Sequence, residues 1–342
     1  MEKASDKNGS IDITSIGGAA FDVFICAPHT ISNDNIQFPL GGKVKAKCVS
    51  ESCGGGATNT SVGFSRLGMN AQFCGVMADD EWGKRIQKNL EDEGVSIDAA
   101  LIVEDEVSSF SVILVDEESG RRSIIYSPNV NAHICDPIFP KDSLKKSKWI
   151  FLNHLTDVSC VILDDVVDLI SPSTPAGRSG QTNFCKFVWN PGGSQIRDGF
   201  DAKIIKDLLK HTNILFLNSE EALKFTRASS IEDALKTGVS AGAKIMCVTD
   251  GANGAYISDG EKTFNAEAIK DIKIVDTTGA GDAFAVGVTW AIYEDMSLSD
   301  ALCAGMISSA SVIQHIGTQA GLLTDTEIRN RLKDSSVSVS QL

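Results

Sequence analysis

One short segment in the last quarter of the chain combines glycines, hydroxyl groups and two carboxylates. It runs Asp276-Thr277-Thr278-Gly279-Ala280-Gly281-Asp282-Ala283-Phe284. The pattern predicts a strand over 272–275 before it and an apolar helix over 283–292 after it. N–H groups at a helix start bind oxyanions, and glycines let a ligand approach the backbone. Asp282 could take a proton from an attacking hydroxyl, which predicts phosphoryl transfer; a glycine turn with a capping aspartate is the alternative.

Other segments also carry groups that could bind a small polar ligand. They are Gly17 to Asp22, Ser52 to Thr60, Asn218 to Glu221 and Thr249 to Gly254. The carboxylate of Asp22 could accept protons from two hydroxyls, and the amide of Asn59 can both donate and accept. Each segment has a structural alternative, because Asn218 and Glu221 would also cap a helix and the fourth segment would also form a hairpin turn.

The elements that must position these groups follow from the apolar pattern. From about 149 to 249 apolar strands alternate with helices, which predicts a parallel sheet covered on both faces. Two β-rich pieces, near 36–51 and 100–127, are predicted to form a small separate sheet over the site. We expect one domain over 11–330, flexible tails at 1–10 and 334–342, and a surface loop over 171–183.

Two distant segments resemble the signatures of the ribokinase-like carbohydrate kinases, the PfkB family. DTTGAGDAFAVG, from Asp276, is similar to the C-terminal signature. Residues 52–60, 66–68 and 75–83 are similar to the N-terminal one. The resemblance extends from about residue 13 to 323. It implies a three-layer α/β/α ribokinase-like fold with a mostly parallel central sheet and a small β-sheet lid.

The resemblance also implies a role for each segment. Asp282 would be the general base, and Gly279, Ala280 and Gly281 would form the anion hole. Asp22, Gly54, Gly55 and Asn59 would bind substrate, while Asn218, Thr249, Gly251 and Gly254 would border the nucleotide. Glu221 would act on Mg²⁺ through water. Asp276 and Thr278, with carbonyls around Gly317 and Gly321, would hold a monovalent cation. ATP, Mg²⁺ and K⁺ are the implied cofactors.

The chain departs from the family pattern at several positions. Gly56 stands where ribokinase has a lysine, Met77-Ala78 stands where valine-glycine is usual, and residues 152–155 lack the acid that ribokinase uses. These departures put ribose in doubt, so hexoses, pentoses, sugar acids and nucleosides all stay open, with a nucleoside kinase as the alternative. Arg121 and Arg122 could reach an acidic substrate or belong to a solvated turn, and His154 is interpreted as a structural histidine.

Three competing classes are less well supported. A P-loop kinase needs G-x-x-x-x-G-K-[ST], and the segment from Gly254 to Thr263 has the wrong spacing. A dinucleotide oxidoreductase needs a third glycine where Phe284 stands. A non-catalytic sugar-binding protein would not need Asp282 and its glycines.

The composition bounds the class of protein and its partners. The net charge of −14 argues against nucleic-acid binding, and no apolar run is long enough to span a membrane. The polar N-terminus does not look like a signal peptide, and the nine scattered cysteines are expected to be free thiols in a reducing cytosol. We therefore expect a cytoplasmic protein with a small-molecule substrate. It could form a homodimer through the exposed edges of its lid.

Overall fold

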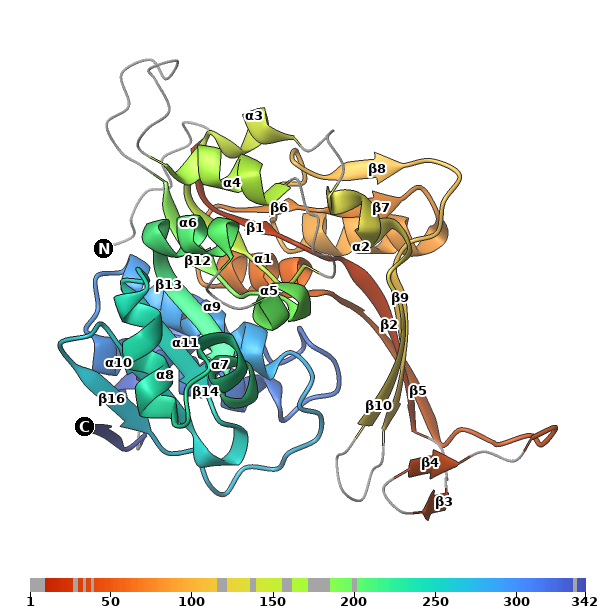
Figure 1. The fold of residues 1–342 in the computed structure, drawn as a ribbon. Coiled ribbons are helices and arrows are strands. Elements are labelled where there is room, and N and C mark those ends of the chain that lie inside the picture. The colour runs from red at the N-terminus through yellow and green to blue at the C-terminus, as the bar shows by residue number, and fades with distance from the viewer. Residues whose placement is uncertain are drawn as a thin grey trace.

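A nine-stranded sheet forms the centre of the molecule (Figure 1). The computed structural model describes residues 10–26, 30–32, 35–37, 40–115, 122–135, 140–155, 162–171, 185–198, 202–334 and 337–342. The strand order is β17-β16-β15-β14-β13-β12-β11-β1-β6. The parallel strands are β1 (Ile11–Ile16), β6 (Ala71–Cys74), β11 (Ser147–Leu152), β12 (Lys186–Trp189), β13 (Thr212–Asn218) and β14 (Ile245–Thr249). The antiparallel edge consists of β15 (Ala255–Ser258), β16 (Thr263–Ala266) and β17 (Val339–Gln341).

The strands are apolar on both faces because each face is covered by helices. Phe151 and Ile214 point into one core cluster, and their neighbours Ile150 and Leu215 point into the other. The first cluster is covered by α1 (Gly56–Arg66), α9 (Ala280–Tyr293), α10 (Leu298–Val312) and α11 (Asp325–Lys333). The second is covered by α4 (Ile162–Ile170), α6 (Lys203–His211), α7 (Ser219–Thr226) and α8 (Ile231–Ser240). This confirms the predicted three-layer fold.

A four-stranded lid projects from this body as an extended arm (Figure 1). Its strand order is β10-β9-β2-β5, with β10 (Arg122–Ser127), β9 (Phe110–Val115), β2 (Ala20–Cys26) and β5 (Cys48–Gly54). The prediction located the lid in 36–51 and 100–127 and missed β2, a central strand. Gly17, with φ of 150°, and Gly18 turn the chain out of the main sheet after β1. The positive φ favours glycine there.

Some residues assigned to the lid belong elsewhere. The strand β8 (Leu101–Val103) pairs with β7 (Val76–Ala78), and β4 (Asn35–Gln37) pairs with β3 (Thr30–Ser32) in a separate two-stranded ribbon. The remaining short elements are η1 (Asn129–Cys135), α3 (Lys141–Leu144), α5 (Gly193–Asp198) and η2 (Gly251–Asn253). The predicted hairpin of β9 and β10 is present, although its turn lies outside the described residues.

Aromatic packing attaches the base of the lid to the body. Trp82, on α2 (Glu81–Asp92), lies between Phe21 of β2 and Phe110 of β9, with ring centroids 6.2 and 4.9 Å away. The guanidinium of Arg85 lies over the Phe21 ring, 4.4 Å from its centroid. These contacts fix where the lid leaves the body, since buried aromatic pairs add to the free energy of packing.

The expectation of free thiols is wrong for one pair of cysteines. Cys26 and Cys48 form a disulfide between β2 and β5. The antiparallel register puts them directly opposite each other with Cα atoms 5.0 Å apart, a separation that a disulfide spans. Cys53, Cys74, Cys247 and Cys303 are free thiols.

The C-terminal segment also differs from its prediction. Residues 334–342 were expected to be a flexible tail, yet Val339 to Gln341 pair with β16 and extend the main sheet. The N-terminal residues 1–9 lie outside the described residues, as does all of the loop expected over 171–183 except its first residue. None of the helices in the described ranges is long and apolar enough to cross a bilayer.

Candidate active site

The predicted anion hole lies at the start of α9. Its N-cap, Gly279, has φ of 79°, and a Cβ there would lie 2.9 Å from the Cβ of Thr318, so glycine is required for both reasons. Asp276 holds the preceding turn, because its Oδ1 accepts from the N and Oγ1 of Thr278 at 2.9 and 2.6 Å. Its Oδ2 accepts from the N–H of Gly317 at 3.2 Å. The free N–H groups of the first helical turn therefore face outward from a braced loop.

A chain of hydrogen bonds orients Asp282. The hydroxyl of Thr318 donates to Asn59 Oδ1 at 2.8 Å, and Asn59 Nδ2 donates to Asp282 Oδ2 at 2.8 Å. Because its Oδ1 is occupied by a donor, the amide must turn its NH₂ toward the carboxylate. This arrangement fixes one oxygen of Asp282. Thr318 was missed by the sequence analysis, which had only the neighbouring Gly317 as a weak signal.

Burial changes the acidity of Asp282. Desolvation raises the pKa of its carboxyl to about 6, while the hydrogen bond from Asn59 lowers it. Burial penalises the charged form of a carboxylate and a donor stabilises it, so the two effects oppose each other. At neutral pH the group is mostly ionised, yet it is a stronger base than an ordinary aspartate.

Asp22 lies on the inner face of the lid, with Gly54 against it. Desolvation raises the pKa of the Asp22 carboxyl to about 6, Ser111 lowers it by donating a hydrogen bond, and the charge of Asp276 raises it. A Cβ on Gly54 would lie 1.9 Å from Asp22 Oδ2, so only glycine fits there. Ser52, opposite Asp22 on β5, has a buried hydroxyl without a hydrogen-bond partner among the described residues, which leaves it available to a ligand.

A cavity of about 320 Å³ adjoins these residues. Its lining consists of Gly18, Ala20, Gly55, Gly56, Tyr126, Asn131, Ile134, His154 and Leu155. Tyr126 comes from the lid and was not predicted. Asn131 is occupied, since it accepts from the N of Ala19 at 3.2 Å and donates to its O at 3.0 Å. The cavity therefore offers mainly apolar and aromatic surface to a ligand.

His154 lines this cavity and also forms a structural hydrogen bond. Its Nε2 accepts from the N–H of Gly193 at 3.2 Å, which requires Nε2 to be unprotonated. Burial lowers the pKa of the imidazole, against the charge of Glu221, which raises it. The ring is therefore neutral at pH 7 and presents a flat polar surface.

The predicted nucleotide residues meet at the carboxyl ends of neighbouring strands. Asn218 of β13 pairs in register with Thr249 of β14. Asn218 and Glu221 form a capping box, with mutual side-chain to backbone hydrogen bonds of 2.8 and 3.0 Å. Gly251 and Gly254 have φ of 54° and 99°, and a Cβ on Gly254 would lie 1.9 Å from the O of Ala266. Asn218 and Glu221 therefore cap a helix, and Thr249 to Gly254 form a turn, as the structural alternatives predicted. The same residues could also border a nucleotide.

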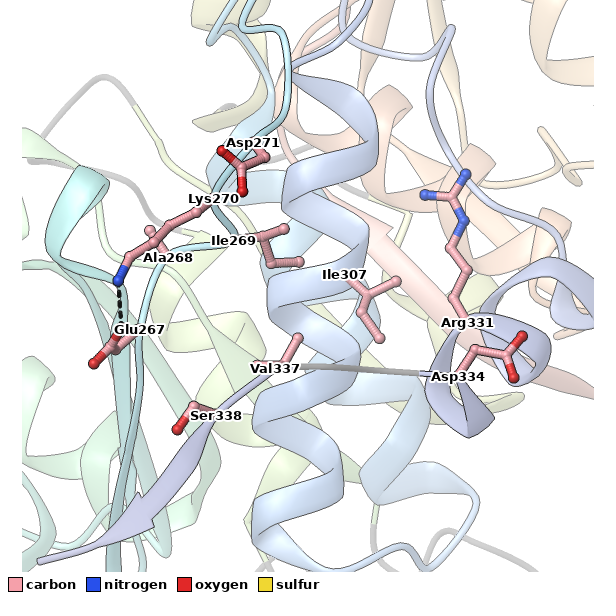
Figure 2. Close-up of a pocket in the computed structure, with 10 residues that line it drawn as sticks. All are labelled: Glu267, Ala268, Ile269, Lys270, Asp271, Ile307, Arg331, Asp334, Val337 and Ser338. Carbon is pink, nitrogen blue, oxygen red and sulfur yellow. Dashed lines mark hydrogen bonds and ion pairs between the residues drawn. The ribbon is translucent and has the colours of Figure 1, made fainter.

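A second cavity, of about 440 Å³, lies away from every predicted site residue (Figure 2). Ile307 of α10 lies at its centre, Glu267 to Asp271 and Ser338 line one side, Arg331 and Asp334 line the other, and Val337 lies between them. Lys270 is paired with Glu267 at 2.8 Å. The cavity is lined by both acidic and basic side chains, so its charge favours neither anionic nor cationic ligands.

Metal-binding clusters are absent from the parts of the chain that the structure describes, where no three His, Cys, Asp or Glu side chains converge. Asp276 is the residue whose surroundings fit a cation best. It is 1% exposed, and its hydrogen-bond partners among the described residues are neutral N–H and O–H groups. A buried carboxylate without a countercharge is costly, so a monovalent cation with carbonyl ligands suits this position.

Known families and proteins match most of the chain. A family model described as pfkB family carbohydrate kinase matches residues 24–325. The chain is 28% identical over 261 residues to an uncharacterized sugar kinase of Archaeoglobus fulgidus, covering 76% of this chain and 98% of that protein. It is 24% identical to a nucleoside kinase of Methanocaldococcus jannaschii, covering 94% and 96%.

The structural neighbours share the fold. Arabidopsis thaliana ribokinase, complexed with ribose and ATP, superposes with a TM-score of 0.75 at 22% identity, covering 95% of this chain and 100% of that one. The nucleoside kinase of Burkholderia thailandensis, in complex with inosine, superposes with a TM-score of 0.74 at 16% identity, covering 95% and 98%.

Proposed function

The chain belongs to the pfkB family of carbohydrate kinases, and from that premise we propose that it transfers the γ-phosphate of ATP to a hydroxyl of a sugar or nucleoside, with Asp282 as the general base. The observation that carries the proposal is the position of Asp282. Its carboxylate lies in the first turn of α9, beside the outward N–H groups, and Asn59 holds it at 2.8 Å. A base and an anion-binding helix start therefore share one location.

The transfer balances with the groups of this chain. The substrate hydroxyl gives its proton to the free oxygen of Asp282, and its oxygen forms a bond to the γ-phosphorus. The bond from that phosphorus to the oxygen bridging to the β-phosphate breaks, and ADP leaves with the electron pair. The N–H groups of Gly281 and Asp282 would bind the oxygens of the phosphoryl group as charge shifts onto the leaving ADP. The N–H of Ala280 would join them on leaving its 3.4 Å contact with the carbonyl of Thr277.

Asp22 and the glycines beside it would hold the acceptor. The Asp22 carboxylate and the unpartnered Ser52 hydroxyl lie opposite each other on the lid, where they can accept from and donate to substrate hydroxyls. Gly54 and Gly55 leave room for that contact. The amide of Asn59 already forms hydrogen bonds to Thr318 and Asp282, which leaves it little capacity to bind a substrate hydroxyl. Its main role is therefore to position Asp282.

A nucleoside is the second candidate acceptor, and the lining of the substrate-side cavity favours it. Tyr126, Ile134 and Leu155 supply apolar surface, and the neutral ring of His154 can stack on a base. A free hexose placed there would bury hydroxyls without partners, at about 1–3 kcal/mol each. Relatives named ribokinase and relatives named nucleoside kinase both match the chain. The argument for a sugar or a nucleoside acceptor therefore depends on this cavity.

Mg²⁺ would arrive with ATP and neutralise its phosphates. It binds mostly water and phosphate oxygens, and the second oxygen of Glu221 could hold one of those waters while the first caps α7. Asp276 and the carbonyls near Thr278 and Gly317 would hold K⁺, whose charge would brace the loop before α9.

Replacing Asp282 with asparagine should abolish efficient transfer. The amide keeps the size of the side chain and can accept from Asn59, but it removes the base, so kcat should fall by roughly 10²–10⁴-fold. The affinity for ATP should change little, because the backbone donors remain. The measurement is phosphate transfer to fructose, ribose, 2-keto-3-deoxygluconate, adenosine, cytidine and fructose 6-phosphate. A folded variant that works at the wild-type rate would show that Asp282 is not the base.

Potassium should activate the enzyme. If Asp276 and the nearby carbonyls hold K⁺, its charge orders the turn that carries the anion hole. Initial rates should therefore rise when K⁺ replaces tetramethylammonium at equal ionic strength. Equal rates in the two salts would remove Asp276 from the role of cation ligand.

The lid should mediate a homodimer. Its outer face, turned away from Asp22, carries Val49 and Ile125, each 61% exposed, beside the half-buried Val23, Ile25 and Val112. Exposed apolar sheet faces with open edges are normally covered. Light scattering at micromolar concentration should give twice the mass of the chain, and Ile125→Lys should reduce it to the monomer. A monomeric wild type under these conditions would refute lid pairing.

A further inference from the structure

Arg122 extends from the lid to the turn that precedes α9. It is the first residue of β10, and its Nη1 donates to the hydroxyl of Thr277. The carbonyl of Thr277 in turn accepts from the N–H of Ala280, the first residue of α9, at 3.4 Å. A lid side chain thus contacts the loop that forms the anion hole, across 155 positions of the sequence.

The strand register turns Arg122 toward the site. Arg122 pairs with Val115, and Tyr126 pairs with Ser111, the residue that bonds Asp22. Alternate residues of a strand share a face, so Arg122 lies on the lid face that carries Tyr126 and Asp22. Val115 pairs in turn with Cys26, and the disulfide from Cys26 to Cys48 ties the lid strands at that same row. Arg122 is therefore presented from a cross-linked part of the lid.

The hydrogen bonding of Arg122 is incomplete. Its Nε is buried and has no partner among the described residues, and its Nη1 donates to a neutral hydroxyl. Other arginines of the chain are paired with carboxylates: Arg66 with Glu93, Arg85 with Glu51, and Arg329 with Asp325 and Glu294. Among the described residues no acid is bonded to this guanidinium, which lies beside an anion-binding helix start and is therefore placed to bind an anion.

We propose that Arg122 is a catalytic residue supplied by the lid, whose guanidinium binds the oxygens of the phosphoryl group while it is transferred. This inference rests on the proposed kinase function and deepens it. The planar fork of donors matches phosphate oxygens, and the charge adds to that of the helix N–H groups. Arg122 donates hydrogen bonds only; the proton of the acceptor hydroxyl still goes to Asp282. Lid closure over the acceptor would thereby complete the anion hole.

The test compares kcat and KM for variants of Arg122. Removing one donor to a developing oxyanion costs roughly 10²–10³-fold in kcat. Arg122→Gln should therefore lose that much in kcat, with little change in the KM for ATP or in the KM for the acceptor. Arg122→Lys should recover part of the rate, because it keeps the charge but not the fork. Guanidinium ion added to Arg122→Ala should restore activity in a saturable way. Ser123→Ala, at the adjacent position on the opposite face, is the matched control and should behave like wild type.

Thr277→Val separates catalysis from a purely structural latch. It removes the neutral hydrogen bond and should slow the enzyme by less than about tenfold, since such a bond contributes about 0.5–1.5 kcal/mol. If Thr277→Val loses as much rate as Arg122→Gln, or if guanidinium gives no rescue, Arg122 acts only by holding the lid. An active wild type with an equally active Arg122→Gln overturns this inference alone. A wild type that transfers phosphate to no acceptor overturns the proposed function together with it.

Discussion

The amide of Asn59, held between the hydroxyl of Thr318 and the carboxylate of Asp282, joins the parts of the molecule that the site depends on. These residues belong to α1, the loop after α10, and α9, so the hydrogen bonds form only when those segments pack closely. Glycines permit that approach: a Cβ on Gly63 of α1 would lie 3.0 Å from the side chain of Val286 of α9, and one on Gly287 would lie 2.5 Å from the O of Ala304. The helix packing behind the site therefore determines where the base points.

Electrostatics then divide the site into two halves. The acceptor side gathers buried carboxylates, with the pKa of Asp22 and of Asp282 both raised to about 6 by desolvation. The phosphate side relies on backbone N–H groups and on the loop that Asp276 braces. Carboxylates near a transferring phosphate repel it, so the site needs positive charge from elsewhere. In the account given above, a cation at Asp276, magnesium on the phosphates and Arg122 from the lid supply it.

The sequence predicted the elements that are determined by residues close together in the chain. The glycine turn and helix around Asp282 were recognised because the motif and the apolar periodicity lie in one stretch, and the β9–β10 hairpin likewise. The strand predicted over 272–275 was wrong, because the chain between β16 and α9 forms no strand. The transfer of β2 to the lid was missed, since Ala20 to Cys26 is as apolar as a core strand and pairs with residues far away in the chain. Thr318, Tyr126 and the disulfide partner of Cys26 share this limitation: each has its role only through tertiary register.

The pH dependence of kcat in wild type and in Asn59→Leu tests the central claim most directly, because kcat reports groups that titrate in the enzyme–substrate complex. The account predicts a wild-type rate that falls below about pH 6, where Asp282 becomes protonated. Removal of the Asn59 donor destabilises the carboxylate, so in the variant the fall should move to higher pH while the rate on the plateau drops. A wild-type rate that stays constant well below pH 6, or a variant whose profile does not move upward, would contradict the assignment of Asp282 as the base that Asn59 orients.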